Sequence, residues 1–154
     1  MNNQYIEILK QNTRQEITHR FIPKSNEKFF FIDPINGMIV EINRILNYDN
    51  CKFAKCFKTE KEAQKHLDFL LAEDFLKQKA FELNNGWEPN WNNENQPKCH
   101  ICYNHSNNNL AINSVYKYNF NPNIIYLKDD SDAQTMINLY SKELKTYFGV
   151  LDEQ

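Results

Sequence analysis

One segment constrains the fold more than any other, because it joins a helix start signal to a long apolar series. In Thr59-Glu60-Lys61-Glu62 the threonine can accept from free helix amides while the glutamate bonds back, which is a capping box. Asn84-Asn85-Gly86 is a suitable helix stop. The sequence therefore predicts a helix over about residues 59–83 whose buried face has helical spacing: Ala63, Leu67, Leu70, Leu71, Phe75 and Leu76.

A second helix is predicted over about residues 131–148. Ser131 and Gln134 form another capping box, and Gly149 can end the helix. The expected buried stripe consists of Ala133, Ile137, Tyr140, Leu144 and Phe148. Residues 1–20 show a weaker helical spacing, which predicts a short N-terminal helix or arm.

The β-prone stretches form two groups. Residues 29–32 and 38–42 flank Asp33-Pro34-Ile35-Asn36-Gly37, in which Asn-Gly favours a hairpin turn. Residues 98–104, 110–118 and 123–128 follow one another at the spacing of a three-stranded antiparallel meander. Between the groups, the less regular residues 43–55 are expected to cover the sheet, with Cys51, Phe53 and Phe57.

This element order predicts an α+β fold. The hairpin and the meander are expected to form an antiparallel β-sheet that the two main helices cover on one face. The chain has 154 residues, which suits one domain, expected over residues 21–150 with a tail at 151–154.

Charge and composition limit which partners and which cellular location can be expected. The net charge is −2, so no general positive field attracts nucleic acid. No apolar run approaches the roughly 18 residues of a membrane span, and the N-terminus lacks a signal-peptide pattern. We therefore expect a cytoplasmic protein with reduced cysteines and no membrane contact.

Both tryptophans lie in the amide-rich segment NNGWEPNWNNENQ, residues 84–96. Pro89 restricts its own φ and disfavours the helical region for Glu88, so Trp87 and Trp91 are expected on an extended loop. The rings can fold back as the fastening of the loop, with the amides bonding its backbone. Alternatively, they can anchor a partner, since tryptophan is enriched in binding hot spots.

Zinc binding and cysteine catalysis are the sharpest chemical alternatives. The pairs Cys51-x4-Cys56 and Cys99-x2-Cys102 offer four thiols, with His100 or His105 in reserve. However, strand positions three apart point to opposite faces, which separates Cys99 from Cys102. No nucleophile motif surrounds a thiol, so we expect packing cysteines and predict no metal, cofactor or catalytic residue.

Aromatic residues follow the second meander strand. Tyr116 and Tyr118, with nearby lysines, can form a stacking surface for single-stranded nucleic acid. Cross-strand aromatic packing explains them equally well, and the net charge argues against nucleic-acid binding. The candidate partner-binding residues are Trp87, Glu88, Trp91, Asn92, Tyr116 and Tyr118.

Four segments within about residues 24–150 share a pattern with other proteins: KFFFIDPINGMIVEI, CFKTEKEAQKHLDFLL, FELNNGWEPNWNNENQPKCHICYNH and NIIYLKDDSDAQTMINLYSKELKTYFGV. In these segments the chain resembles a group of small, mostly uncharacterised phage and prophage proteins of low-GC bacteria. Thr59, Trp87, Pro89, Trp91, Asn92 and Gln96 lie on the shared pattern, whereas Cys99 and Cys102 replace aromatic or aliphatic residues.

The resemblance implies a setting in which small accessory proteins act by binding. The leading hypothesis is a non-catalytic inhibitor of a host defence protein or nuclease complex, such as an anti-CRISPR protein. One alternative is a structural or regulatory phage module that self-associates through residues 110–118. A cysteine-dependent enzyme or a zinc-binding protein is a further alternative.

Overall fold

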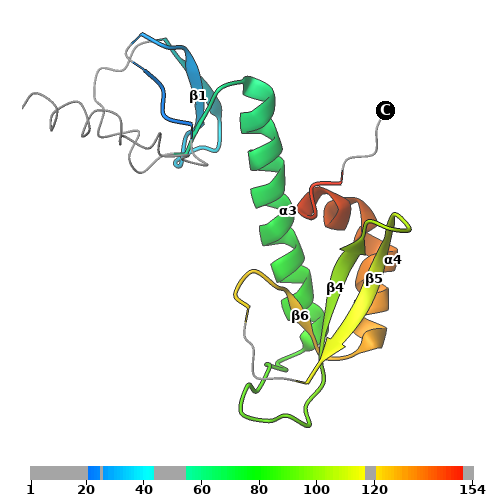
Figure 1. Ribbon diagram of the computed structural model, residues 1–154. Helices are drawn as coiled ribbons and strands as arrows, with labels where there is room; N and C mark the ends of the chain where they lie inside the picture. Colours follow the sequence, from blue (N-terminus) through cyan, green and yellow to red (C-terminus); the bar gives the residue numbers. More distant parts are fainter. Residues whose placement is uncertain (1–20, 25, 44–54, 117–120, 151–154) are drawn as a thin grey trace, which may run out of the picture. The chain divides into compact units, whose positions relative to one another are not determined.

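The computed structural model describes residues 21–24, 26–43, 55–116 and 121–150. Within these ranges it contains two helices and two three-stranded antiparallel sheets, which confirms the α+β fold class (Figure 1). The hairpin and the later strands belong to different sheets and do not form the one sheet that was expected. The chain divides into two compact units, residues 1–64 and 65–154, and each is described by itself. The predicted N-terminal helix and the tail lie outside the described residues. The expected single domain over residues 21–150 stays a prediction.

The first unit contains sheet A, in the order β2-β1-β3, rather than a hairpin alone. Its strands are β1 (Phe29–Ile32), β2 (Ile39–Ile42) and β3 (Cys56–Phe57). The predicted hairpin is confirmed, and Phe29 pairs with Ile42 while Ile32 pairs with Ile39. Residues Phe30, Phe57 and Ala63 form its small core. Phe57 was expected to cover the sheet and instead extends it, while Cys51 and Phe53 lie outside the described residues.

The hairpin turn follows from its side chains. The Asp33 carboxylate accepts from the Ile35 N–H at 2.8 Å, and the Asn36 side chain accepts from the Met38 N–H at 2.9 Å. Gly37 has a φ of +70°, which glycine adopts at low cost. The turn therefore forms as the Asn-Gly pair predicts.

Helix α3 (Glu60–Asn84) begins in the first unit and continues in the second. The capping box is confirmed: the Glu62 N–H donates to Thr59 Oγ1 at 3.2 Å, and the Thr59 N–H donates to the Glu62 carboxylate at 3.1 Å. The stop is confirmed too, since Asn85 and Gly86 have φ values of +47° and +82°.

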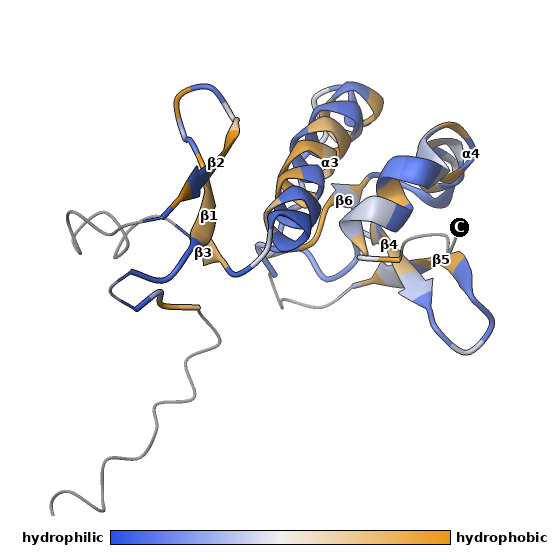
Figure 2. Ribbon diagram, turned by 90° about the horizontal axis from the view of Figure 1, so that it is seen from above, coloured by the Kyte–Doolittle hydropathy of each residue, from blue (hydrophilic) through white to orange (hydrophobic). Residues whose placement is uncertain are grey.

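The predicted buried face of α3 is partly wrong. Ala63 and Leu76 are buried, but Leu70, Leu71 and Phe75 are exposed. Of the α3 residues in the second unit, Ala72, Leu76 and Ala80 are the buried apolar ones. Apolar residues occur along the whole helix, interleaved with hydrophilic ones, and they occupy more than one face (Figure 2). Only the face that meets the core is buried.

Sheet B of the second unit consists of β4 (Lys98–Asn104), β5 (Asn109–Val115) and β6 (Tyr126–Leu127). All pairs are antiparallel, but the order is β5-β4-β6, so the predicted meander order is wrong. The short β6 pairs with β4 at Cys99 and His100 instead of following β5. The spacing of β-prone segments in the sequence predicts where strands form but not which strands pair. Because β6 pairs with the free edge of β4, β4 becomes the central strand and has a partner on each side.

Helix α4 (Asp130–Tyr147) covers sheet B, as the contacts between these elements show. Its N-cap is Asp129, whose carboxylate accepts from the Asp132 N–H at 3.0 Å, so the predicted cap at Ser131 is wrong. Aspartate and serine are comparable N-cap residues, so Asp129, two residues before Ser131, can cap the helix in its place. Gly149, with a φ of +69°, ends the helix as predicted.

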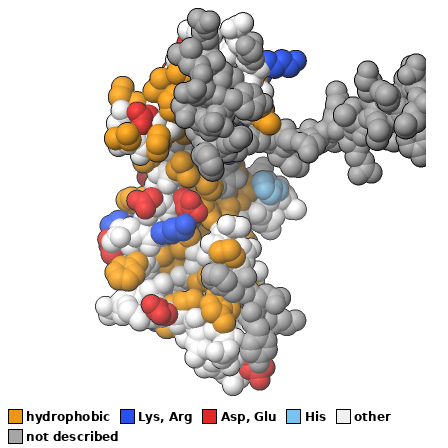
Figure 3. All heavy atoms as spheres, turned by 90° about the vertical axis from the view of Figure 1, so that its left-hand side faces the viewer, with side chains coloured by type: hydrophobic (Ala, Val, Ile, Leu, Met, Phe, Trp, Pro, Cys, Tyr) orange, Lys and Arg blue, Asp and Glu red, His pale blue; other side chains and the backbone are white. Residues whose placement is uncertain are grey.

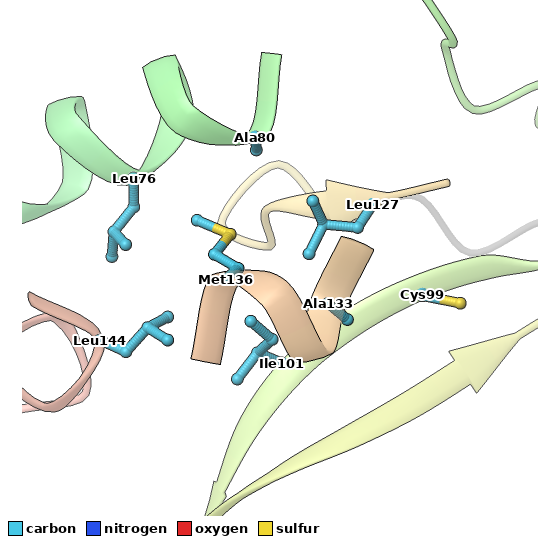
Figure 4. Packing of buried hydrophobic residues seen from close by; sticks show 8 residues of the cluster. All are labelled: Leu76, Ala80, Cys99, Ile101, Leu127, Ala133, Met136 and Leu144. Carbon is cyan, nitrogen blue, oxygen red and sulfur yellow. The ribbon is translucent and has the colours of Figure 1, made fainter. Parts of the chain in front are cut away.

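One hydrophobic core joins α3, α4 and sheet B in the second unit. Figure 4 shows helix side chains directed toward Ile101 of β4 and Leu127 of β6. The buried cluster consists of Leu76, Ala80, Cys99, Ile101, Leu127, Ala133, Met136 and Leu144. Ile137, Tyr140 and Phe148 of the predicted α4 stripe pack against it. Among the described helices, none combines the length and apolar character needed to cross a bilayer.

Candidate functional site

The tryptophan loop, residues 85–97, connects the end of α3 to the start of β4. Asn84 fixes its starting point, because its side-chain amide donates to the Tyr126 carbonyl and accepts from the Lys128 N–H, both at 2.9 Å. The loop and the end of β5 lie at the same end of sheet B (Figure 1). The loop therefore leaves a fixed helix end and enters the central strand of sheet B.

Amide side chains bond the backbone within the loop, as the sequence predicts. Asn90 and Asn93 each accept from the N–H two residues later, at 3.0 and 2.9 Å. Gln96 spans the loop, since its side chain accepts from the Asn90 N–H and donates to the Glu88 carbonyl. Such local bonds supply partners that a helix or strand would otherwise supply.

A buried lysine lies under this loop. The Lys98 side chain has no exposed surface, and its Nζ donates to the carbonyls of Asn93 and Gln96 at 3.0 and 2.9 Å. The same Nζ lies 5.4 Å from the centre of the Trp91 ring. Burying a charge is costly, and two carbonyls with an indole face offset that cost. Lys98 therefore ties the loop to β4.

Trp91 also holds the loop against sheet B. The centre of its ring lies 5.0 Å from the centre of the Tyr126 ring, in an edge-to-face arrangement, and the Tyr126 ring centre lies 6.0 Å from that of His100. Alternation along β4 places Lys98 and His100 on the face opposite Cys99 and Ile101. Trp91 thus packs on the outer face of sheet B, which favours the fastening explanation for this ring.

The six predicted binding residues differ in what they offer a partner. Trp87 and Trp91 are half-buried, whereas Glu88 and Asn92 are exposed on the loop. Tyr116 is 54% exposed and follows Val115, the residue of β5 that pairs with Lys98. These five residues therefore occur at one end of sheet B, and Tyr118 lies outside the described residues.

Sequence reasoning missed Lys98. The sequence predicts only that Lys98 begins a strand, where a lysine is ordinarily solvated. Two signals in the sequence bear on it. Alternation with Cys99 and Ile101 predicts that Lys98 points away from the core. The loop just before it contains two tryptophan rings, against which a lysine can pack.

Cys99 belongs to a polar cluster on the other face of β4. Its Sγ lies 3.2 Å from Ser114 Oγ and 3.1 Å from Asp130 Oδ1, and Ser114 Oγ donates to the same oxygen at 3.0 Å. Burial raises the pKa of the Cys99 thiol, and the nearby Asp130 adds to this. A protonated, buried thiol is a poor nucleophile, which argues against a catalytic role for Cys99. The contacts of Cys99 and Ser114 with Asp130 instead link α4 to sheet B.

The remaining thiols are separated. Cys102 lies on the opposite face of β4 from Cys99, as expected, and its Sγ is 3.5 Å from the Ala111 carbonyl. Cys56 is buried in the first unit, and Cys51 lies outside the described residues. Among the residues that the structure places, three or more His, Cys, Asp or Glu side chains never gather as a metal site would require.

A small apolar cavity of about 40 Å³ lies between the C-terminal part of α4 and sheet B. Its lining includes Ile101, Ile125 and Tyr147, and the Tyr147 hydroxyl donates to the Asn123 carbonyl at 2.6 Å. Ligand sites commonly measure about 300–1,000 Å³, so this cavity is far too small for a metabolite.

Comparisons of the chain with protein-family models, with curated proteins and with solved structures give no match.

Proposed function

We propose that this protein is a non-catalytic inhibitor that binds a host defence protein or nuclease complex in the bacterial cytoplasm. The phage setting comes from the sequence resemblance, and the binding mode comes from the tryptophan loop. The observation that carries the proposal is a loop fixed from below by Lys98 that presents exposed polar side chains at one end of sheet B.

A fixed loop suits recognition of another protein surface. Ordering a flexible loop on binding costs affinity, and the Lys98, Asn90, Asn93 and Gln96 bonds already order this loop. We propose that Glu88, Asn92 and Tyr116, with the accessible parts of Trp87 and Trp91, form the contact surface.

The test is a plaque assay in host strains that each carry one defence system. The full-length protein is expected to restore phage plating in at least one strain. In that strain, the double variant Glu88→Arg/Asn92→Arg should reduce inhibition by about tenfold or more, because two bulky cations replace matched polar groups in the interface. Failure to inhibit any system would contradict the proposal.

The matched control is Asn107→Arg. Asn107 is exposed in the β4–β5 turn, at the opposite end of sheet B from the tryptophan loop. It should inhibit as strongly as the unmodified protein. Equal inhibition by the loop variant and the control, with both folded by circular dichroism, would exclude the loop as the contact surface.

Self-association as a structural or regulatory module is the second candidate, because β5 lies at one edge of sheet B. Edge strands carry unpaired backbone groups that can pair with another chain. A stable oligomer in analytical ultracentrifugation, with no inhibition of any defence system, would favour this candidate.

A further inference from the structure

A second apolar face runs along α3, apart from the face in the core. On this face Leu70 and Phe81 are 40% and 71% exposed. At about 100° per residue, Leu70 and Phe81 are turned by roughly 120–140° from the buried Leu76. Figure 3 shows hydrophobic side chains interleaved with acidic and basic ones on one side of the molecule.

Four residues form a straight stripe on this face: Leu70, Asp74, Lys77 and Phe81. Their spacings of four, three and four residues place them in line along the helix. All four are exposed, and Lys77 also pairs with Glu73 at 2.9 Å while keeping 52% of its side chain accessible. Apolar residues therefore enclose one acidic and one basic residue.

This stripe is complementary to its own reverse. Read backwards, the order apolar, acidic, basic, apolar becomes apolar, basic, acidic, apolar. In an antiparallel helix pair, Asp74 meets Lys77 of the second copy, and Leu70 meets Phe81 of the second copy. Both pairings share one midpoint, between Phe75 and Leu76, as a two-fold axis requires. A parallel pair in register would instead place Asp74 against Asp74.

We propose that this protein forms a two-fold homodimer through antiparallel pairing of α3 with α3 of a second copy. Two ion pairs at the centre fix the direction and register, and the apolar residues on either side supply the buried area. A single helix pair buries an area at the low end of protein interfaces, below about 1,200 Å² in total. The dimer is therefore expected to be weak, with a Kd on the order of micromolar.

Sedimentation velocity of the full chain, across micromolar concentrations, tests this proposal. The unmodified protein should shift from monomer to dimer as its concentration rises. Asp74→Lys and Lys77→Asp should each raise the Kd at least about tenfold, because like charges then face each other twice in every dimer.

Two recombinations make the test specific for this register. An equimolar mixture of Asp74→Lys and Lys77→Asp should form a heterodimer, since each lysine pair then faces an aspartate pair. The double variant Asp74→Lys/Lys77→Asp should dimerise again, because exchanging the charges preserves the self-complementarity. Circular dichroism melts establish that the single variants are folded.

Leu139→Glu is the control, since Leu139 is an exposed leucine of α4 outside the stripe. It should dimerise like the unmodified protein. A chain that stays monomeric at all concentrations would overturn the proposal. So would a dimer that persists in both single variants, which would place the contact elsewhere, with the β5 edge as the first alternative.

Discussion

Two neighbouring residues of β4, Lys98 and Cys99, fasten opposite faces of sheet B by different chemistry. Lys98 is a buried cation that holds the tryptophan loop through two carbonyls and an indole ring. Cys99 is a neutral thiol that shares bonds with Ser114 and Asp130 and so joins α4 to the sheet. The charged fastening orders an irregular loop, whereas the neutral one adds to a face already held by hydrophobic packing.

The largest effect on stability is expected from Trp91→Ala, which removes the ring that packs against the Lys98 ammonium. The loss combines apolar burial, the ring contact with Tyr126 and the interaction with Lys98, and should lower the free energy of unfolding by about 3 kcal/mol. Urea unfolding followed by circular dichroism measures it.

Trp87→Ala is the matched control on the same loop. Trp87 is also half-buried, but the described residues place no ring and no ammonium against it. Its replacement should cost clearly less than that of Trp91. Equal losses for the two variants would mean that the contacts with Lys98 and Tyr126 contribute little.

Lys98→Met should lower the free energy of unfolding by about 2 kcal/mol. The methionine keeps most of the apolar stem but leaves the Asn93 and Gln96 carbonyls without the ammonium. The loop should also become more accessible, which acrylamide quenching of tryptophan fluorescence would show. A variant as stable as the unmodified protein, with unchanged quenching, would show that the bonds from Lys98 to the loop carbonyls do not hold the loop in place.

Ser114→Ala should have a smaller effect, about 1 kcal/mol, on the neutral side. It removes one hydroxyl from the cluster, but Cys99 keeps its contact with Asp130, and the core next to it is unchanged. The same urea titration measures the effect. A loss as large as that of Lys98→Met would show that the neutral fastening matters as much as the charged one.

Local signals predicted the elements well, because they act over a few residues. The Thr59–Glu62 box, the Asn36-Gly37 turn and the Gly149 stop all form as the sequence indicates. The strand order of sheet B was missed because it depends on which strands meet across the core. The buried face of α3 was misjudged for a similar reason, since this helix has two apolar faces and the sequence does not say which one is covered.

The candidate site was only partly predictable. The amide-rich loop and the folding back of Trp91 follow from composition and from the size of the ring. Lys98 was missed because its burial depends on where the loop carbonyls of Asn93 and Gln96 lie. A local pattern holds no information about that arrangement.

His100 gives the smallest expected effect, and it contrasts with Lys98, which lies on the same face of β4. Lys98 is held by two carbonyls, whereas buried His100 Nδ1 has no hydrogen-bond partner among the described residues. Burial lowers the pKa of His100 below its ordinary value near 6.5, so the folded protein favours the neutral ring.

The sign of the pH dependence follows from this shift. Below about pH 6.5 the unfolded chain binds a proton that folded His100 resists, so its contribution to stability is present above that pH and is lost as the pH falls toward the folded pKa. His100→Gln should flatten this part of the stability profile between about pH 7 and pH 5. Urea midpoints measured across that range test it. An unchanged slope would mean that protonated His100 finds a partner on the outer face, as Lys98 does.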